Sequence, residues 1–125
     1  MTEGPRHGEV WWADLEPVVG SEANKTRPVV IVGAPEFERI PLRLVMPCTT
    51  WQSRFERHLN KAALPPSDAN GFSADSAADA LQLRSRSLDR FEFKVGVLNA
   101  DELAAVMKAV ALVTGLDPEL VGGST

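Results

Sequence analysis

The sequence predicts an α+β fold in which antiparallel strands form a small, partly open barrel and one long helix follows near the C-terminal end. Three observations support this. Short segments rich in β-branched and aromatic residues alternate with turn-forming residues through most of the chain. The one clear helical pattern appears only after them. The length of 125 residues fits a single domain, 1–125, and neither a repeat nor a linker divides it.

The first two strands have the clearest patterns. Residues 8–15 (GEVWWADL) are rich in aromatic and β-branched side chains. Residues 27–33 (RPVVIVG) form a continuous apolar run, which predicts a strand buried on both faces, and Pro28 is tolerated at its start. The polar stretch 16–26 between them is a loop of the length that usually has a function.

The middle of the chain is harder to interpret. Residues 42–48 (LRLVMPC) predict a third strand that ends on Thr49 and Thr50. The alanines of residues 75–84 (DSAADALQLR) favour a helix by propensity, although the pattern also fits a strand. The other segments are a loop or one helical turn at 50–57, a weak strand at 58–64 and a turn-rich connection at 65–74.

The C-terminal elements follow from local signals. A short helical turn is expected at 87–90, and Phe91, Phe93, Val95 and Val97 alternate as in a strand over 91–98. For the helix over 100–114, Asn99 is a good N-cap, Glu102 completes a capping box and Gly115 is a typical stop. This helix is apolar nearly all round. We therefore expect it to be buried on more than one side, with a second subunit as the hypothetical cover.

Composition places few limits on function. The net charge is -4 and the pI is about 5.1, which is not the basic excess typical of nucleic-acid binders. Basic residues do gather in the middle of the chain, so a basic face on an acidic body is one arrangement and a mixed solvated surface is the other. No apolar run is long enough to span a membrane, and no signal peptide is recognised. The single cysteine, Cys48, fits a reducing cytoplasm.

The sequence lacks the residue patterns that most classes of catalytic site require. His7, His58 and Cys48 show no metal-ligand spacing, and no nucleotide-cofactor motif is present, so neither a metal nor a cofactor is expected. Cys48 lies within an apolar strand, which favours a buried, inert thiol over a nucleophile. Arginines on strand ends and loops remain, and their planar forks bind two phosphate oxygens at once. The residues alone therefore indicate a phosphate-binding surface.

Four sequence blocks resemble the MazF/PemK toxin family. The first contains GEVWWADLEP at 8–17, GSE at 20–22 and RPVV at 27–30. The others are VMPCTT at 45–50, GFSADSAADALQLR at 71–84 and LNADEL at 98–103. Each block is weak alone, but together they cover nearly the whole chain in the family's order. The resemblance also favours the strand over the helix for residues 75–84.

The resemblance implies an SH3-like antiparallel β-barrel with a long C-terminal α-helix, usually as a homodimer. It implies a sequence-specific, metal-independent endoribonuclease that cleaves single-stranded RNA, including mRNA, and leaves 2′,3′-cyclic phosphate and 5′-OH ends. A cognate MazE-like antitoxin would block the RNA groove. Two alternatives stay open. These are a non-catalytic toxin, like the gyrase poisons that share this plan, and an SH3-like binding module without turnover.

The resemblance also implies roles for particular residues. Arg27 matches the catalytic arginine, and we expect an electrostatic role because the pKa of arginine lies above roughly 12. Thr49 matches the catalytic threonine, whose hydroxyl would hold the phosphate. The residues expected to contact RNA are Ser21, Glu22, Lys25, Thr50, Trp51, Gln82 and Arg84. Where many relatives carry an acid before the glutamine this chain has Leu81, and Thr26 stands where some have a histidine, so the general acid and base are not assigned.

Overall fold

The computed structural model describes residues 4–15 and 26–117. Its strands are β1 (Glu9–Asp14), β2 (Thr26–Ile31), β3 (Leu42–Thr50), β4 (Lys61–Leu64), β5 (Ser76–Asp79), β6 (Arg84–Ser87) and β7 (Phe91–Val97). One helix follows, α1 (Ala100–Thr114). Short 3-10 turns connect the strands: η1 (Pro35–Phe37), η2 (Ser53–Arg57), η3 (Ala80–Gln82) and η4 (Leu88–Arg90).

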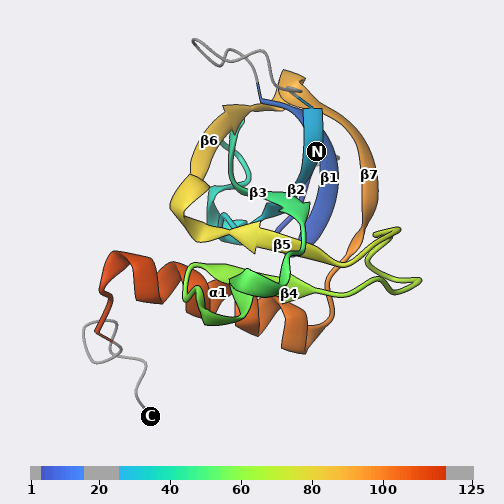
Figure 1. Cartoon of the computed structure of the whole chain (residues 1–125). Helices are drawn as coiled ribbons and strands as arrows, with labels where there is room; N and C mark the ends of the chain where they lie inside the picture. The colour runs from blue at the N-terminus through green and yellow to red at the C-terminus, as the bar shows by residue number, and fades with distance from the viewer. Residues whose placement is uncertain (1–3, 16–25, 118–125) are drawn as a thin grey trace, which may run out of the picture.

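All the strands belong to one curled antiparallel sheet. Its order is β4-β5-β3-β2-β1-β7, and β6 pairs with β3 beside this path. Figure 1 shows β1, β2, β3, β6 and β7 curving into a ring, with β5, β4 and then α1 below it. This arrangement confirms the predicted α+β class, and the open, curled sheet fits an SH3-like barrel with a C-terminal helix.

Strand β3 joins the two parts of the sheet because it changes partners along its length. Its first residues pair with β6, from Leu42 opposite Ser87 to Val45 opposite Arg84. On its other edge, Val45, Met46 and Pro47 pair with β2. From Cys48 to Thr50, β3 pairs with β5. The pairing of β3 with β2 ends at Pro47, so the two strands separate beyond this residue.

Two apolar clusters stabilise the fold. The smaller one lies on one face of the first three strands and contains Ala13, Leu15, Val29, Ile31 and Val45. The larger one joins the opposite face of the sheet to β4, β5 and the helix, with Val10, Val30, Met46, Leu64, Ala78 and Val106 among its members. Because β2 contributes to both clusters, it is buried on both faces, as its apolar run predicted.

The helix begins and ends at the predicted signals. The Asn99 side chain accepts a hydrogen bond from the Glu102 N–H at 2.7 Å, and the Glu102 carboxylate accepts one from the Asn99 N–H at 2.9 Å. Gly115 caps the C-terminal end with a φ of 66°. Only one face of the helix is covered, and on the other face Met107 and Leu112 are 37% and 46% exposed.

Residues 75–84 are neither one helix nor one strand. Ser76–Asp79 form β5, η3 follows at once, and β6 begins only at Arg84. The Asp79 side chain causes the break because it accepts a hydrogen bond from the Leu81 N–H at 3.0 Å and caps the turn. The single strand expected over this stretch is therefore wrong in its second half. The weak fourth strand expected at 58–64 is correspondingly shorter, at Lys61–Leu64.

Candidate active site

Arg27 and Thr49 occupy matching positions on neighbouring strands. The last pair in the β2–β3 ladder is Val29 with Pro47, and two more residues of the same register would set Arg27 opposite Thr49. The β2–β3 ladder ends at this pair, and Thr49 pairs with Ala77 of β5. The two strands part at this point, and a cleft of about 480 Å³ lies there.

The lining of the cleft contains one charged group and several hydroxyl groups. Arg27 is the only charged side chain among the described residues that line it. Hydroxyl side chains surround that charge: Thr26, Thr49, Thr50, Ser73 and Ser76. A guanidinium together with hydroxyl donors is a suitable set for binding and stabilising an anionic phosphate.

Aromatic side chains form part of the wall. Trp12 of β1 and Phe93 of β7 stack with their ring centroids 6.1 Å apart and their planes within 10° of parallel. Phe93 is 55% exposed, so one ring of this pair is open to solvent. Phe72 also lines the cleft but is buried in the larger apolar cluster. The exposed Phe93 ring offers a surface on which an unpaired base can stack.

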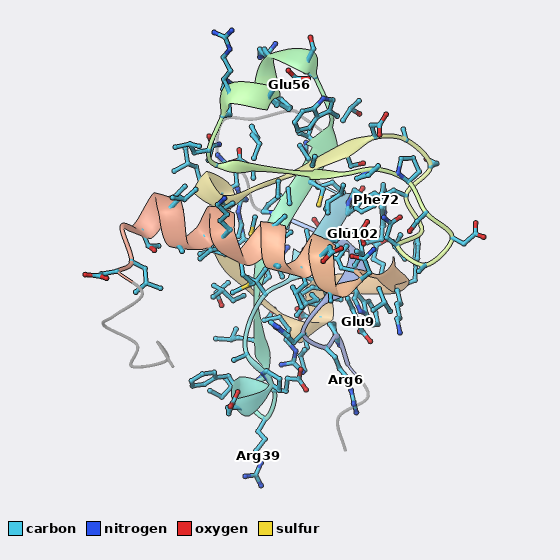
Figure 2. The ribbon with its side chains drawn as sticks, turned by 90° about the horizontal axis from the view of Figure 1, so that it is seen from below. Arg6, Glu9, Arg39, Glu56, Phe72 and Glu102 are labelled. Atoms are coloured by element: carbon cyan, nitrogen blue, oxygen red, sulfur yellow. The ribbon has the colours of Figure 1, made fainter. Side chains whose placement is uncertain are left out.

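The loop before β5 supplies the other wall, and Asn70 holds it in place. Asn70 is fully buried, and its side-chain oxygen accepts hydrogen bonds from the Ser67 and Phe72 N–H groups, both at 3.0 Å. Its side-chain nitrogen donates to the Pro65 carbonyl at 2.8 Å and to the Glu102 carboxylate at 2.9 Å. Figure 2 shows Phe72 and Glu102 on these adjoining segments. The loop is thereby tied to the first turn of α1.

Two glycines allow this loop to approach β7 closely. Gly71 has a φ of +77°, and a Cβ built there would collide with the Val95 carbonyl oxygen. A Cβ on Gly96 would collide with the backbone of Asn70. Both positions therefore exclude any side chain, because the obstacle is backbone rather than a movable side-chain end.

The thiol of Cys48 lies in the cleft wall but is unreactive near neutral pH. It lines the cleft and is only 2% exposed. Burial raises the pKa of the thiol to about 12, even though the nearby Arg27 charge acts in the opposite direction. Since the thiolate is the nucleophilic form, Cys48 does not serve as a nucleophile near neutral pH, in keeping with the inert thiol expected from the sequence.

The other expected RNA contacts are distributed unevenly. Thr50 lines the cleft with Arg27 and Thr49. Trp51 lines a separate, neighbouring hollow. Gln82 and Arg84 line neither hollow, and they bind each other through a hydrogen bond of 2.6 Å from the Arg84 guanidinium to the Gln82 side-chain oxygen. Ser21, Glu22 and Lys25 lie outside the described residues, so their roles stay predictions.

Arg84 is some distance from the cleft. It lies opposite Val45, four residues before Thr49 on β3, which corresponds to roughly 13 Å along a strand. Arg43, another of the central basic residues, is 4% exposed and donates to the carbonyl oxygens of Pro5, Ile40 and Leu42. It is therefore a structural group and does not contribute to a basic face.

Sequence reasoning missed Trp12, Phe93 and the cleft-lining loop. A signal for Trp12 was present, because successive strand residues point to opposite faces and the adjacent Trp11 and Trp12 cannot both face one core. Trp11 packs against the smaller apolar cluster, which leaves Trp12 for the other side. No comparable signal marks the loop, because its position depends on the contact with β7.

In the described part of the chain, no helix is both long and apolar enough to cross a membrane. Among the same residues, no group of three or more His, Cys, Asp and Glu side chains is arranged to hold a metal ion.

Solved structures share this architecture. A crystal structure of MazF from Deinococcus radiodurans superposes with a TM-score of 0.71 at 22% identity, covering 90% of this chain and 98% of that one. An endoribonuclease from a mycobacterial species, solved in complex with its cognate antitoxin, gives a TM-score of 0.71 at 19% identity, covering 90% and 97%. At these identities the likeness shows the shared fold.

Sequence comparison goes further than the fold. The chain is 34% identical over 113 residues to endoribonuclease MazF9 of Mycobacterium tuberculosis, covering 86% of this chain and 93% of the relative. It is 30% identical over 112 residues to endoribonuclease EndoA of Bacillus subtilis, covering 86% and 91%. A family model for PemK-like, MazF-like toxins of type II toxin–antitoxin systems matches residues 6–114. The resemblance noted in the sequence is thereby confirmed, and the chain belongs to the PemK-like, MazF-like toxin family.

Proposed function

We propose that this chain is a sequence-specific endoribonuclease toxin that cleaves single-stranded RNA, mRNA included, without a metal ion. The observation that carries the proposal is the placement of Arg27 and Thr49, from two neighbouring strands, in one open cleft. The naming of the relatives MazF9 and EndoA as endoribonucleases supports the reaction class. An mRNA substrate implies action in the cytoplasm.

The proposed reaction is an internal displacement at phosphorus. The ribose 2′-oxygen loses its proton and forms a bond to phosphorus, and the bond from phosphorus to the 5′-oxygen breaks. The 5′-oxygen then gains a proton. The products are a 2′,3′-cyclic phosphate and a 5′-OH, and no water or other reactant enters this step. Negative charge builds up on the phosphate oxygens in the transition state, which is where donors contribute most.

The side chains of Arg27 and Thr49 are able to stabilise this negative charge. The planar guanidinium of Arg27 donates to two phosphate oxygens at once, and its permanent positive charge offsets the growing negative charge. The Thr49 hydroxyl donates one further hydrogen bond from the adjacent strand. Both groups bind and stabilise the phosphate, and Arg27 does not transfer a proton because the pKa of arginine lies above roughly 12.

A cognate MazE-like antitoxin is the proposed protein partner. Related toxins have been solved as complexes with an antitoxin, among them MazE–MazF of Deinococcus radiodurans. An antitoxin segment that covers the cleft would exclude RNA. The proposal predicts that a preformed complex does not cut RNA and that activity returns when the antitoxin is degraded by a protease.

A homodimer is also proposed. Large apolar side chains remain exposed on and just after α1: Met107, Leu112 and Leu116 are 37%, 46% and 45% exposed. A second copy that packs on this face would bury them and supply the cover expected from the all-round apolar helix. Sedimentation that shows only monomer at micromolar concentration would contradict this assembly.

The central test is cleavage of a labelled single-stranded RNA in excess EDTA. We expect cutting, with ends that behave as cyclic phosphate and free 5′-OH. Arg27→Ala should abolish cutting while the unfolding transition is retained. The matched control is Arg39→Ala, whose side chain projects from the end of the molecule opposite Glu56 (Figure 2). Strict dependence on added magnesium would remove the mechanism. RNA that is bound but not cut would indicate an SH3-like binding module. Poisoning of gyrase without RNA cleavage would indicate a non-catalytic toxin.

A further inference from the structure

A second hollow lies beside the Arg27–Thr49 cleft, at the ends of three strands. It measures about 270 Å³ and is lined by Trp51, Ala63, Leu64, Pro65, Asp75 and Ser76. Ser76 lines the cleft as well, and Thr50 of the cleft is the residue before Trp51. The two hollows are therefore neighbours on one surface.

Strand register sets Trp51 and Asp75 on the same side as Thr49. The β3–β5 ladder pairs Thr49 with Ala77 and Thr50 with Ser76, and a hydrogen bond of 2.9 Å from the Trp51 N–H to the Asp75 carbonyl continues it by one row. Residues opposite each other point the same way, and every second residue along a strand repeats that direction. Trp51 lies two residues from Thr49, or about 7 Å along the strand, a span that one nucleotide bridges.

The Trp51 ring is held firmly enough to act as a platform. It packs in a T-shaped arrangement with the buried Phe55 of η2, with ring centroids 5.5 Å apart and planes at 88°. Phe55 in turn carries the Lys61 ammonium 4.4 Å from its ring centroid. A braced, half-buried indole beside a phosphate-binding cleft is a stacking surface for an unpaired base.

Asp75 supplies the selective group. Its side chain is exposed, and within the described part of the chain no hydrogen bond to its carboxylate is present. An ionised carboxylate accepts hydrogen bonds through two adjacent oxygens and donates none. Guanine is the one RNA base with two neighbouring donors on its Watson–Crick edge, N1–H and N2–H₂. Uracil offers one donor between two acceptors, and adenine and cytosine each place their amino donor beside an acceptor.

We propose that the Trp51–Asp75 hollow is a base subsite that selects guanine next to the bond that is cut. The base stacks on Trp51, and its two donors face the Asp75 carboxylate. This inference rests on the proposed ribonuclease function and adds to it one position of the recognised sequence.

The first experiment maps cut sites on a long RNA of known sequence. We expect guanine at one fixed position beside the cut. Asp75→Asn replaces one acceptor by a donor, so the preference for guanine over adenine there should fall by about tenfold or more. Asp68→Asn, an exposed aspartate that lines neither hollow, is the matched control and should leave the pattern unchanged. Cutting without a fixed guanine, or an unchanged pattern in Asp75→Asn, would overturn the subsite alone, whereas absence of cutting would overturn the nuclease proposal.

The second experiment measures binding of RNA that carries a 2′-deoxy sugar at the cut site and therefore cannot be cleaved. Replacing the guanine by inosine removes the N2 amino group, and the wild-type protein should bind severalfold more weakly. In Asp75→Asn that difference should disappear. Trp51→Ala should weaken binding of both RNAs, whereas Trp51→Phe keeps a ring and retains most of it. If Trp51→Ala binds and cuts RNA like the wild type but no longer binds a protein partner, the hollow is a protein-docking site and the inference is wrong.

Discussion

The side-chain nitrogen of Asn70 donates a hydrogen bond of 2.9 Å to the Glu102 carboxylate, which joins the cleft-lining loop to the start of α1. The same carboxylate accepts from the Asn99 N–H and closes the capping box. One glutamate therefore stabilises the helix terminus and also positions the loop before β5. Stability and site geometry are coupled through this contact.

Replacing Asn70 should destabilise the fold. Asn70→Ala leaves buried partners without hydrogen bonds, which costs about 2–3 kcal/mol. Asn70→Asp should be at least as harmful, because it sets a second carboxylate against Glu102. Equilibrium unfolding in urea measures both. Asp68→Ala, in the exposed part of the same loop, should stay within about 0.5 kcal/mol of the wild type. A near-neutral Asn70→Ala would show that the loop does not depend on this contact.

Gly96→Ala tests the close approach of β7 and the loop. The new methyl group would collide with the Asn70 backbone, so we expect a loss of about 1–3 kcal/mol and a displaced cleft wall. Gly33→Ala is the control, because its Cβ would meet Leu44 at an ordinary 3.5 Å. Thermal unfolding compares the two. Equal stability of both variants would contradict the close approach of Gly96 in β7 to the backbone of Asn70.

Arg27→Lys and Thr49→Val separate charge from geometry in the proposed reaction. Lysine keeps the charge but loses the two-pronged fork, so cleavage should slow by about tenfold or more. Valine keeps the shape but removes the hydroxyl donor, and loss of such a donor lowers the rate by about 10²–10³-fold. Single-turnover cleavage at saturating protein measures both rates. Thr49→Val that cuts at the wild-type rate would exclude the hydroxyl from the chemistry.

Asp79 should make stability depend on pH. Burial opposes ionisation of its carboxylate, but hydrogen bonds from Asn60, Lys61 and the Leu81 N–H outweigh burial and hold its pKa below the ordinary 3.8. The resulting stability is complete above about pH 4 and is lost as the pH falls through the lower native pKa. The difference in unfolding free energy between wild type and Asp79→Asn should therefore shrink on acidification. In a protein that already carries Lys61→Met, Asp79→Asn should lower the unfolding free energy at pH 7 by less than it does in the wild type.

Cys48 should react with thiol reagents only after unfolding. The rise in its pKa from 9.0 to about 12 lowers the thiolate fraction near pH 8 by about a thousandfold, and burial blocks access as well. A disulfide reagent added to the native protein should give a slow colour change, which becomes fast in denaturant. Rapid reaction of the native protein would show that the floor of the cleft opens readily.

Local signals predicted the elements that depend on them. The helix was found from its capping box and terminal glycine, and β2 from its apolar run, because these patterns act over a few residues. β5 was not predictable in the same way. Its alanines favour a helix, but Ala77 and Ala78 lie between β3 and β4 in a fully buried position, so sheet pairing overrides propensity. Asp79 is a residue type that commonly caps a turn, so the end of β5 had a signal in the sequence.

The sequence identified some of the residues that line the cleft but not the shape of the cleft. Motifs singled out Arg27 and Thr49, whereas the register that makes them neighbours depends on the pairing of β2 with β3 across an intervening segment. Gln82 and Arg84 were expected to contact RNA because the family resemblance matched them to a polar pair on a later strand. A turn at Ala80–Gln82 separates β5 from β6, and neither Gln82 nor Arg84 lines the cleft.

The pairing of β1 with β7 has a consequence for synthesis. It joins residues 9–14 to residues 91–97, and Phe93 and Val95 of that late strand complete the cleft wall. A growing polypeptide therefore lacks the assembled cleft until residues 91–97 have emerged from the ribosome. If the proposed ribonuclease function holds, a partly made copy without these residues would be unable to cut the message that encodes it.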